Sequence, residues 1–351
     1  MANPSKELES LAADDERVRN ERSREREVSK LKNQLAYCKQ KLKQAEADLE
    51  HAEKRIDFIR ALDNPTPARY QFKPFKPAGK ATAILVLSDW HVEETVEADT
   101  INGQNEFNLE VAERRIRAVF QNAVKLLDSA RHLSNINDLV VAILGDVITG
   151  YIHVELVESN SLSPTEASLF AQDQICGGLD YLLKHAGVKS ITVPTCFGNH
   201  GRTTEKMRAS TAAQNSYEWL LYKQLERYYR GNSKIRWKVE RGHKNYLDVQ
   251  GHVVRFTHGD AFKYGGGIGG AFVPIRRKIA KWDKGRAADY DIFGHLHTHL
   301  KDTKWCMNNS LIGLSPYGDL VDGEWMPPSQ TLVVFDKGIK PPVLVQEVFC
   351  D

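Results

Sequence analysis

The sequence predicts an α/β protein that is preceded by one long N-terminal helix. Five short apolar runs, rich in β-branched residues, end abruptly in segments that contain Asp, Asn or His, which is typical of buried parallel strands. Amphipathic stretches between these runs predict helices. Residues 6–62 contain neither Gly nor Pro and have the composition of one long helix. We therefore divide the chain into an N-terminal helix (residues 1–62), a linker (63–80) and a main domain (81–351).

Composition restricts the class of protein. At 351 residues the chain has room for one large domain and an appendage, and its formal net charge of +2 is too small to predict a nucleic-acid partner by itself. Five scattered cysteines without a Cys-x-x-Cys pair favour reduced thiols over a disulfide framework. There is no apolar signal region, and no run approaches the roughly 20 apolar residues of a membrane span. We expect a soluble, cytoplasmic protein with no membrane partner.

The N-terminal helix carries a heptad repeat. From Val28 onward apolar or small residues recur at alternating steps of three and four, at Leu31, Leu35, Cys38, Leu42, Ala45, Leu49, Ala52, Ile56 and Ile59. More than four heptads with such a narrow stripe predict a coiled coil and hence a homo-oligomer, with a dimer favoured. Ala and Cys in the stripe weaken the pairing and do not choose decisively between two and three chains. The alternative is a single charged helix that lies on the main domain.

The main domain follows a proline-rich linker and alternates strands with helices. Residues 64–80 contain four prolines, which cannot continue a helix. Strands are expected at 83–87, 140–144, 190–197, 253–257 and 290–293, and helices at 109–133, 164–185, 210–229 and 273–284. Residues 245–249 and 252–257, separated by Gln250-Gly251, predict a hairpin, and a second hairpin is expected at 331–348.

Each of the five apolar runs is followed by residues of the types that commonly bind metals in proteins. The segments are Asp89-Trp90-His91, Gly145-Asp146, Gly198-Asn199-His200, His258-Gly259-Asp260 and Gly294-His295-Leu296-His297. Ligand sites in open sheets gather beyond the carboxyl ends of strands, so we expect the segments to converge. In an extended segment residues i and i+2 point to the same side, which lets the Asp-x-His and His-x-His pairs reach a common centre. A bridging carboxylate, here Asp146, with several His and Asp ligands is the set that holds two divalent ions about 4 Å apart.

Taken together, the five segments resemble the calcineurin-like metallophosphoesterase superfamily, over residues 81–351. The resemblance implies a four-layer α/β/β/α sandwich of two facing mixed sheets. It also implies two ligand sets, which are Asp89, His91, Asp146 and His297 for the first metal, and Asp146, Asn199, His258 and His295 for the second. His200 would act beside Asp146 in catalysis, stabilising the transition state or protonating the leaving oxygen. We expect two divalent ions, Mn²⁺ first, with Fe, Zn, Ni and Mg as alternatives.

Two departures from the superfamily pattern narrow the prediction. The superfamily usually places Asp or Glu after Asn-His to orient the histidine, whereas Gly201 and Arg202 follow His200 here, so that His200 must be oriented from elsewhere. After Gly145-Asp146 the chain lacks the Asp-Arg-Gly of Ser/Thr protein phosphatases, which makes that activity a minor alternative. The strings at 145–156 and 198–204 instead resemble phosphoesterases of tailed phages and related bacterial genomes, often described as DNA-repair exonucleases.

Basic residues near the ligand segments predict a surface for a polyphosphate chain. Arg202 follows the catalytic histidine, and Lys263, Arg276 and Arg277 lie between two ligand segments. Several cations gathered at one place favour binding of a nucleic-acid backbone. The alternative is an ordinary solvated helix face beside a glycine-rich loop. His153 presents the same choice, because it either reaches the substrate or remains in solvent.

The sequence thus predicts a hydrolase, namely a metal-dependent phosphodiesterase of the nuclease or exonuclease kind that acts on nucleic acid. The first alternative is a phosphoesterase for small nucleotides or phosphomonoesters, which a pocket closed by residues 151–163 would favour. From a different class comes a non-catalytic scaffold that retains the fold and assembles through the coiled coil. A partner ATPase stays an open question, because no residue pattern addresses it.

Overall fold

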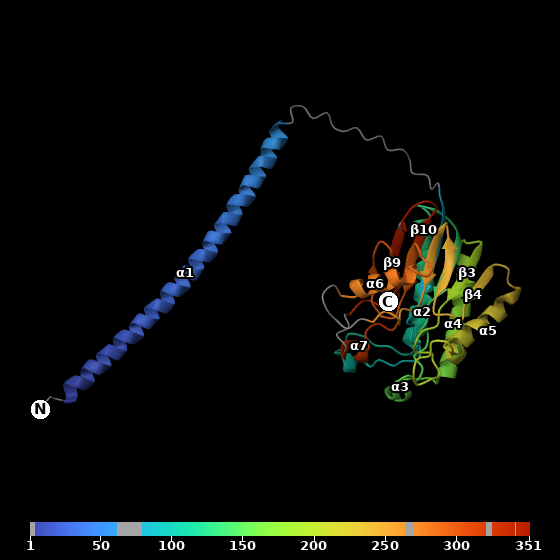
Figure 1. Cartoon of the computed structure of the whole chain (residues 1–351), viewed down its shortest axis with the longest axis horizontal. Coiled ribbons are helices and arrows are strands. Elements are labelled where there is room, and N and C mark those ends of the chain that lie inside the picture. Colours follow the sequence, from blue (N-terminus) through green and yellow to red (C-terminus); the bar gives the residue numbers. More distant parts are fainter. Residues whose placement is uncertain (1–3, 62–78, 264–269, 321–324, 341) are drawn as a thin grey trace. The chain divides into compact units, whose positions relative to one another are not determined.

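The computed structural model describes residues 4–61, 79–263, 270–320, 325–340 and 342–351. The chain divides into two compact units, Met1–Pro74 and Phe75–Asp351 (Figure 1). Most of the linker predicted at 63–80, and most of the glycine-rich loop at 265–270, lie outside the described residues. Among the helices that the structure describes, none combines the length and the apolar character needed to cross a bilayer.

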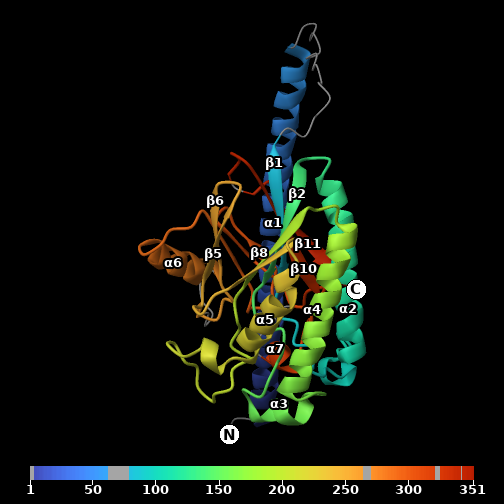
Figure 2. The ribbon, with the colours of Figure 1, turned by 90° about the vertical axis from the view of Figure 1, so that its right-hand side faces the viewer.

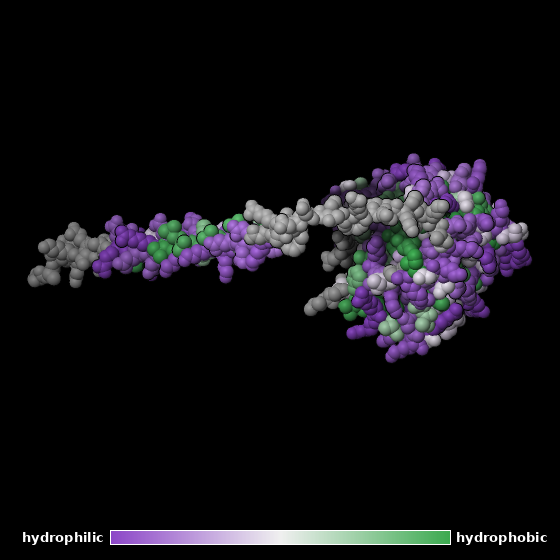
Figure 3. Space-filling model, turned by 90° about the horizontal axis from the view of Figure 1, so that it is seen from above, coloured by the Kyte–Doolittle hydropathy of each residue, from purple (hydrophilic) through white to green (hydrophobic). Residues whose placement is uncertain are grey.

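The described part of the first unit is one helix, α1 (Pro4–Ala61), as the absence of Gly and Pro predicts. Its described side chains, those of residues 15–56, are all exposed. The heptad leucines Leu31, Leu35, Leu42 and Leu49 are 56–60% exposed. Apolar and polar surface lie side by side along this helix (Figure 3). The coiled-coil pairing stays a prediction, to which we return below.

The second unit contains two mixed sheets. The first has the order β11-β10-β1-β2-β3-β4. Strands β1 to β4 run parallel, and β10 is antiparallel to both β1 and β11. The bounds of these strands are β1 (Lys80–Leu87), β2 (Asn135–Ile143), β3 (Ser190–Thr195), β4 (Ile235–Val239), β10 (Ser329–Asp336) and β11 (Leu344–Phe349).

The second sheet has the order β5-β6-β7-β9-β8. Here β6, β7 and β9 run parallel, with β5 and β8 antiparallel at the two edges. The predicted hairpin at 245–257 is confirmed as β5 and β6, and that at 331–348 as β10 and β11. The bounds are β5 (Asn245–Val249), β6 (His252–Phe256), β7 (Tyr290–Phe293), β8 (Leu300–Lys301) and β9 (Trp305–Met307).

The two sheets face each other across a shared apolar layer. Side chains alternate between the faces of a strand, so Ile84 and Val86 of β1 point toward the second sheet, where they join a buried cluster that includes Phe256. Leu85 and Leu87 point the other way, into a larger cluster beneath the helices. Strand β1 is therefore buried on both faces, which explains its continuous apolar run.

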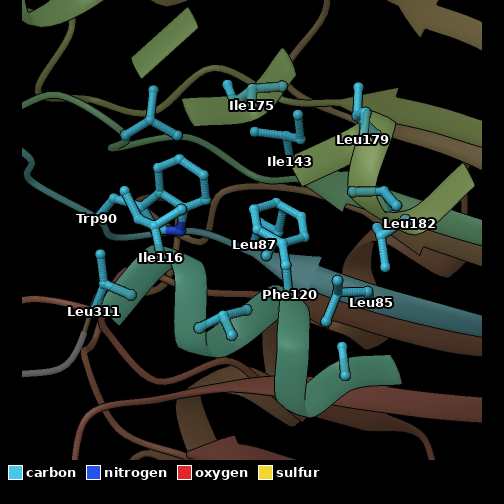
Figure 4. Close-up of a cluster of buried hydrophobic side chains, with 14 of the residues drawn as sticks. Leu85, Leu87, Trp90, Ile116, Phe120, Ile143, Ile175, Leu179, Leu182 and Leu311 are labelled. Carbon is cyan, nitrogen blue, oxygen red and sulfur yellow. The ribbon is translucent and has the colours of Figure 1, made fainter. Parts of the chain in front are cut away.

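Helices cover the outer face of each sheet. α2 (Leu109–Ala130), α4 (Pro164–His185) and α5 (Tyr217–Tyr228) pack on the first sheet, and α6 (Phe272–Asp283) packs on the second (Figure 2). Figure 4 shows Ile116 and Phe120 of α2 among the side chains of β1 and α4. The four-layer α/β/β/α sandwich is confirmed. The short elements are α3 (Val154–Ser159), α7 (Pro316–Leu320) and the 3₁₀ turns η1 (Ala98–Ile101), η2 (Ala213–Asn215) and η3 (Tyr229–Gly231).

Several boundaries differ from the sequence-based expectation, among them the start of β2, which lies at Asn135 and not at residue 140. The helix expected at 210–229 begins only at Tyr217, because the extended backbone of Ser216 lets its hydroxyl cap the helix by accepting from the Trp219 amide at 3.2 Å. The helix expected at 109–133 ends at Ala130. Strands β4, β8 and β9 were not predicted, because each has only two to five residues and no distinct apolar pattern of its own.

Candidate metal centre

The five ligand segments meet at the carboxyl ends of β1, β2, β3, β6 and β7. The loops after β1 and β2 run alongside each other, because the Asp89 amide donates to the Gly145 carbonyl (3.0 Å) and the His91 amide to the Asp146 carbonyl (3.1 Å). The His295 amide donates to the Asp89 carboxylate at 3.0 Å. This last bond joins a loop of the second sheet to a loop of the first, so the site lies where the ends of the two sheets meet.

Glycines in the motifs allow this close approach. A Cβ atom added at Gly198 would overlap the Asp146 carboxylate, and one added at Gly294 would overlap the Asp89 carboxylate. The glycine that precedes Asn199 and the one that precedes His295 are therefore packing requirements, since the backbone of each segment lies directly against a ligand of another.

Five ligand residues have a left-handed backbone conformation. The φ angle is 56° at Asp89, 50° at His91, 51° at Asp146, 78° at His295 and 50° at His297. Such a conformation costs about 1–3 kcal/mol for a residue other than glycine. Only seven non-glycine residues in the described ranges have a positive φ, so this strain is concentrated at the site. The extended backbone that we assumed for the Asp-x-His and His-x-His pairs is therefore wrong, and the pairs converge through tight left-handed turns instead.

Asp89, His91 and His297 form the first cluster, with ligand atoms within 4.8 Å of one another. The Nε2 atoms of His91 and His297 lie 3.2 Å apart, and His297 Nε2 lies 3.5 Å from Asp89 Oδ1. Asp89 and His91 are buried, whereas His297 is partly exposed. One carboxylate and two imidazoles at these distances are a donor set for zinc, manganese or iron.

Asp146, His258 and His295 form the second cluster. His258 Nε2 lies 2.9 Å from Asp146 Oδ2 and 3.2 Å from His295 Nδ1. The side-chain oxygen of Asn199 lies 3.1 Å from His258 Nε2. Asp146 also groups with two residues on the other side, His91 and His200, within the same 4.8 Å limit. Its position between the two clusters is the one that a bridging carboxylate needs.

The electrostatics of the centre suit divalent cations. Burial works to raise the pKa of Asp146, but His258 and His200 outweigh it and hold that pKa well below its ordinary value. Burial likewise works to lower the pKa of His258, but Asp146 raises it well above the ordinary range. Burial and then the charge of His258 lower the pKa of His295 to about 4. Despite the opposing effect of burial, Asp89 also raises the pKa of His297. Ionised carboxylates and neutral imidazoles are the forms that bind metals, so the residues fit once His258 and His297 give up their protons.

His200 is oriented by the backbone. Its Nδ1 atom lies 3.1 Å from the Thr149 carbonyl oxygen, and its amide donates to Asp146 Oδ1 at 2.8 Å. A carbonyl accepts only from a protonated nitrogen, so Nδ1 carries the proton and Nε2 is the ring atom left for a substrate. The Thr149 carbonyl thus performs the orienting role of the acid that is missing after His200.

Sequence analysis missed Glu218 of α5, a buried carboxylate that ties two ligand loops together. Its Oε1 accepts from the Val147 amide at 2.7 Å and its Oε2 from the Gly198 amide at 2.6 Å. A Cβ atom added at Gly201 would lie 2.6 Å from Glu218 Cγ, so glycine there makes room for this side chain. Burial is the main cause that raises the pKa of Glu218 to about 8. Its sequence position, in the first turn of a helix, is ordinary for an acid, and no local signal could have found it.

Two more carboxylates support the loop that carries Thr149. Glu93 Oε1 accepts from the amides of Thr149 (2.9 Å) and Gly150 (2.8 Å). The Thr149 hydroxyl donates to Glu94 Oε2 at 3.3 Å and lies 3.1 Å from His91 Nδ1. A carboxylate, a hydroxyl and an imidazole in series orient His91, as partners of ligating histidines do in metal sites. Burial raises the pKa of both glutamates to about 7.

Among the predicted substrate residues, Arg202 alone contacts a ligand residue in the described part of the chain, through the backbone carbonyl of Asn199. The guanidinium of Arg202 donates to three backbone carbonyls of its own loop at 2.8–3.1 Å, which braces that loop. Arg276 Nε donates to Asp302 at 2.7 Å. The remaining side chains are exposed, at His153, Lys263 and Arg277. Their contact with nucleic acid stays a prediction.

Comparison with known proteins finds similarity among solved structures only, since no family model and no curated protein matches. Vps29 from Chaetomium thermophilum is 12% identical over 76% of this chain and 96% of its own, with a TM-score of 0.31. Vps29 from Entamoeba histolytica, complexed with zinc, is 10% identical over 76% of this chain and 99% of its own, with a TM-score of 0.31. The hypothetical protein PH1004 from Pyrococcus horikoshii is 10% identical over 77% and 89%, with a TM-score of 0.37. Identities this low concern the fold alone, so the assignment of the site rests on its own geometry.

Proposed function

We propose that this protein is a two-metal phosphodiesterase that hydrolyses nucleic acid in the manner of a nuclease or exonuclease. One observation carries the hydrolase part of the proposal. Side chains from five separate loops converge on two adjoining clusters, and Asp146 of the second cluster also groups with His91 of the first and with His200. The motif resemblance to metallophosphoesterases supports the same conclusion.

The ligand sets are those that the resemblance implies. Asp89, His91, Asp146 and His297 would hold one ion, and Asp146, Asn199, His258 and His295 the other. Mn²⁺ is the proposed metal, and Fe, Zn, Ni and Mg are alternatives. Bound ions would neutralise phosphate charge and lower the pKa of water toward neutrality. Glu218, Glu93 and Glu94 keep the ligand loops in place through the backbone and hydroxyl bonds described above.

His200 supplies the proton chemistry. The Thr149 carbonyl fixes the proton on Nδ1 and thereby fixes the ring, which leaves Nε2 to contact an oxygen of the phosphate or of the leaving group. Burial lowers the pKa of His200, an effect that the nearby Asp146 carboxylate opposes. In the neutral ring Nε2 is an acceptor. When the ring carries a second proton, Nε2 donates, and it can then stabilise charge on a phosphate oxygen or protonate the leaving oxygen.

The choice of nucleic acid as substrate rests on sequence features. Exposed Lys263 and Arg277 offer cations to a phosphate backbone, and the strings around Asp146 and His200 resemble phage-type exonucleases. The small-nucleotide alternative is an outcome of the test below.

The test is a substrate panel with purified protein and Mn²⁺. The panel contains labelled single- and double-stranded DNA and RNA together with a small phosphodiester. We expect cleavage of at least one polymer. Asp146→Asn should lower the rate more than about 100-fold, since loss of even an outer partner of a ligand costs 10–100-fold. His132→Gln, an exposed residue outside the site, is the matched control and should leave the rate unchanged.

Each negative result has a separate meaning. Turnover of the small diester without cleavage of any polymer would refute the nucleic-acid part alone. Equal activity of Asp146→Asn and the wild type would refute the catalytic centre itself and would support the scaffold alternative.

A further inference from the structure

Helix α1 carries two kinds of position on its apolar stripe. The large positions are Val28, Leu35, Leu42, Leu49 and Ile56, and all are 47–60% exposed. The positions three residues later begin with Leu31, continue with three small residues, Cys38, Ala45 and Ala52, and end with Ile59. In the middle of the stripe, from Leu35 to Ile56, large and small side chains therefore alternate, and every described side chain of the stripe is exposed.

Side-chain size distinguishes the two ways in which a second copy can pair. Parallel pairing sets every residue opposite its own copy, so that three layers consist only of Cys or Ala and leave voids between layers of Leu. Antiparallel pairing sets the two kinds of position opposite each other. The facing residues are then Leu42 with the partner's Ala45, Leu35 with the partner's Ala52, Leu49 with the partner's Cys38, and Ile56 with the partner's Leu31. Three of the five kinds of layer combine a large with a small side chain. The other two, Ile56 with the partner's Leu31 and Val28 with the partner's Ile59, lie at the ends of the stripe, so no layer consists of two small side chains.

Charges beside the stripe favour the same arrangement. In an antiparallel pair each flank of the stripe faces the same flank of the partner. The facing residues are Lys32 with the partner's Glu53, Lys39 with the partner's Glu46, Lys41 with the partner's Asp48, and Gln34 with the partner's Arg55. Every pair attracts or is neutral, and the twofold axis makes each occur twice.

Other arrangements bring like charges together. In a parallel pair Glu27 would attract the partner's Lys32 and Lys41 the partner's Glu46. Asp48, however, would lie opposite the partner's Glu53 and be repelled. A shift of the antiparallel register by one heptad sets Lys39 opposite the partner's Lys39. The opposite shift sets Glu46 opposite the partner's Glu46. Like charges at these positions disfavour each alternative, which leaves one register.

We infer that α1 forms an antiparallel two-stranded coiled coil with a second copy of this chain, in the register where Leu42 faces the partner's Ala45. The occupant of the exposed stripe is therefore the same stripe of another molecule. This inference is independent of the proposed function, because it uses no residue of the metal centre.

Disulfide trapping of the full-length protein tests the register. In the inferred pair Cys38 lies eleven residues from the partner's Cys38 along the axis, about 16 Å, which is beyond disulfide reach. Mild oxidation of the wild type should therefore give no covalent dimer. Leu49→Cys places a thiol opposite the partner's Cys38 and should give one. Ile56→Cys, which would face the partner's Cys38 only after a one-heptad shift, is the matched control and should give none.

Three outcomes overturn the inference. A covalent dimer of the wild type that disappears in Cys38→Ser indicates parallel pairing. Failure of Leu49→Cys to crosslink indicates another register or another partner. A mass in solution, measured by light scattering, that corresponds to one chain or to three chains excludes the two-stranded coil.

Charge reversal provides a second test that needs no new cysteine. Lys39→Glu sets a carboxylate against the partner's Glu46 at two symmetric places and should raise the dimer dissociation constant about tenfold. Glu46→Lys in the same chain should restore the affinity. In a parallel pair Lys39 would face the partner's neutral Gln34, so a weak effect of Lys39→Glu, or the absence of rescue, contradicts the antiparallel arrangement.

Discussion

His258 carries a proton that a metal ion must displace. Asp146, 2.9 Å away, raises the pKa of His258 well above its ordinary value despite the opposing effect of burial. Because the metal-bound imidazole is neutral, we expect ion binding at pH 7 to release this proton. The apparent affinity for Mn²⁺ should therefore rise with pH up to the pKa of His258. Calorimetric titration at one pH in two buffers with different ionisation enthalpies measures the release.

The control for this titration is His132→Gln, which lies outside the site and should show the same proton release. His258→Asn should show weaker binding and less release. Identical heats in the two buffers would mean that His258 is already neutral in the metal-free protein.

Gly201 and Glu218 form a matched pair whose fit can be tested. Gly201→Ala forces Glu218 away from the Val147 and Gly198 amides, which leaves buried donors unpaired. We expect the free energy of unfolding to fall by about 1–3 kcal/mol, as measured by chemical denaturation. Gly242→Ala, where an added Cβ meets nothing within 4 Å, should leave the stability nearly unchanged. Equal stability of the Gly201→Ala variant and the wild type would show that the loop adjusts freely.

Among single residues, the ligands that directly follow strands could be predicted from the sequence. The residues that support them through tertiary contacts could not. Asp89, Asp146 and His295 were predictable because polar side chains after β-branched runs mark the carboxyl ends of strands. Glu218 and the Thr149 carbonyl act through tertiary contacts, and no local pattern records these. The left-handed backbone of the ligands was equally hidden, since only a small share of non-glycine residues adopts it, even though Asp and His do so more often than most.

Two adjacent glycines in α4 should respond oppositely to replacement by alanine. A Cβ at Gly178 would overlap the Phe120 ring of α2, whereas a Cβ at Gly177 meets nothing within 4 Å. Gly177→Ala should stabilise the protein by about 0.5–1 kcal/mol, because alanine favours the helix. Gly178→Ala should destabilise it by about 1–3 kcal/mol, because the two helices must move apart. Denaturant titration of both variants measures the change in the free energy of unfolding. Changes of the same sign in the two variants would contradict the packing of α4 against Phe120.

Elements with strong periodicity were predictable, and those defined by capping or pairing were less so. The start of α5 depends on Ser216, whose backbone is extended, and an apolar pattern that runs through it does not show the break. Strand β9 has three residues, and its neighbours in the sheet, not its own sequence, give it the strand conformation.

For the whole molecule, metal binding should raise the melting temperature. An ion that binds only the folded state stabilises it by about 2.7 kcal/mol at 100 times its dissociation constant. For a unit of this size, that corresponds to a rise in melting temperature of about 5–10 °C. A thermal melt with Mn²⁺, then with excess chelator, measures the rise and its reversal. Asp146→Asn should lose the shift and His132→Gln should keep it, while a shift that survives in Asp146→Asn would place the ion elsewhere.

The division of the strands between two sheets could not be derived from the sequence itself. Strands that follow each other in the chain, such as β4 and β5, belong to different sheets, and β10 returns from the end of the chain to pair with β1. Such long-range pairings leave no trace in local periodicity. The two-sheet architecture was predicted from the superfamily resemblance, and that resemblance rests on the order of the ligand motifs along the chain.

The left-handed turns at Asp89, His91, Asp146, His295 and His297 have a consequence for how this chain can change. Glycine adopts that backbone conformation without steric cost, so a glycine at any of the five positions would relieve backbone strain. A laboratory selection for heat resistance alone, indifferent to hydrolysis, would therefore drift toward glycine at these places and erase the centre. Durability and reactivity make opposite demands on the same short stretches of backbone.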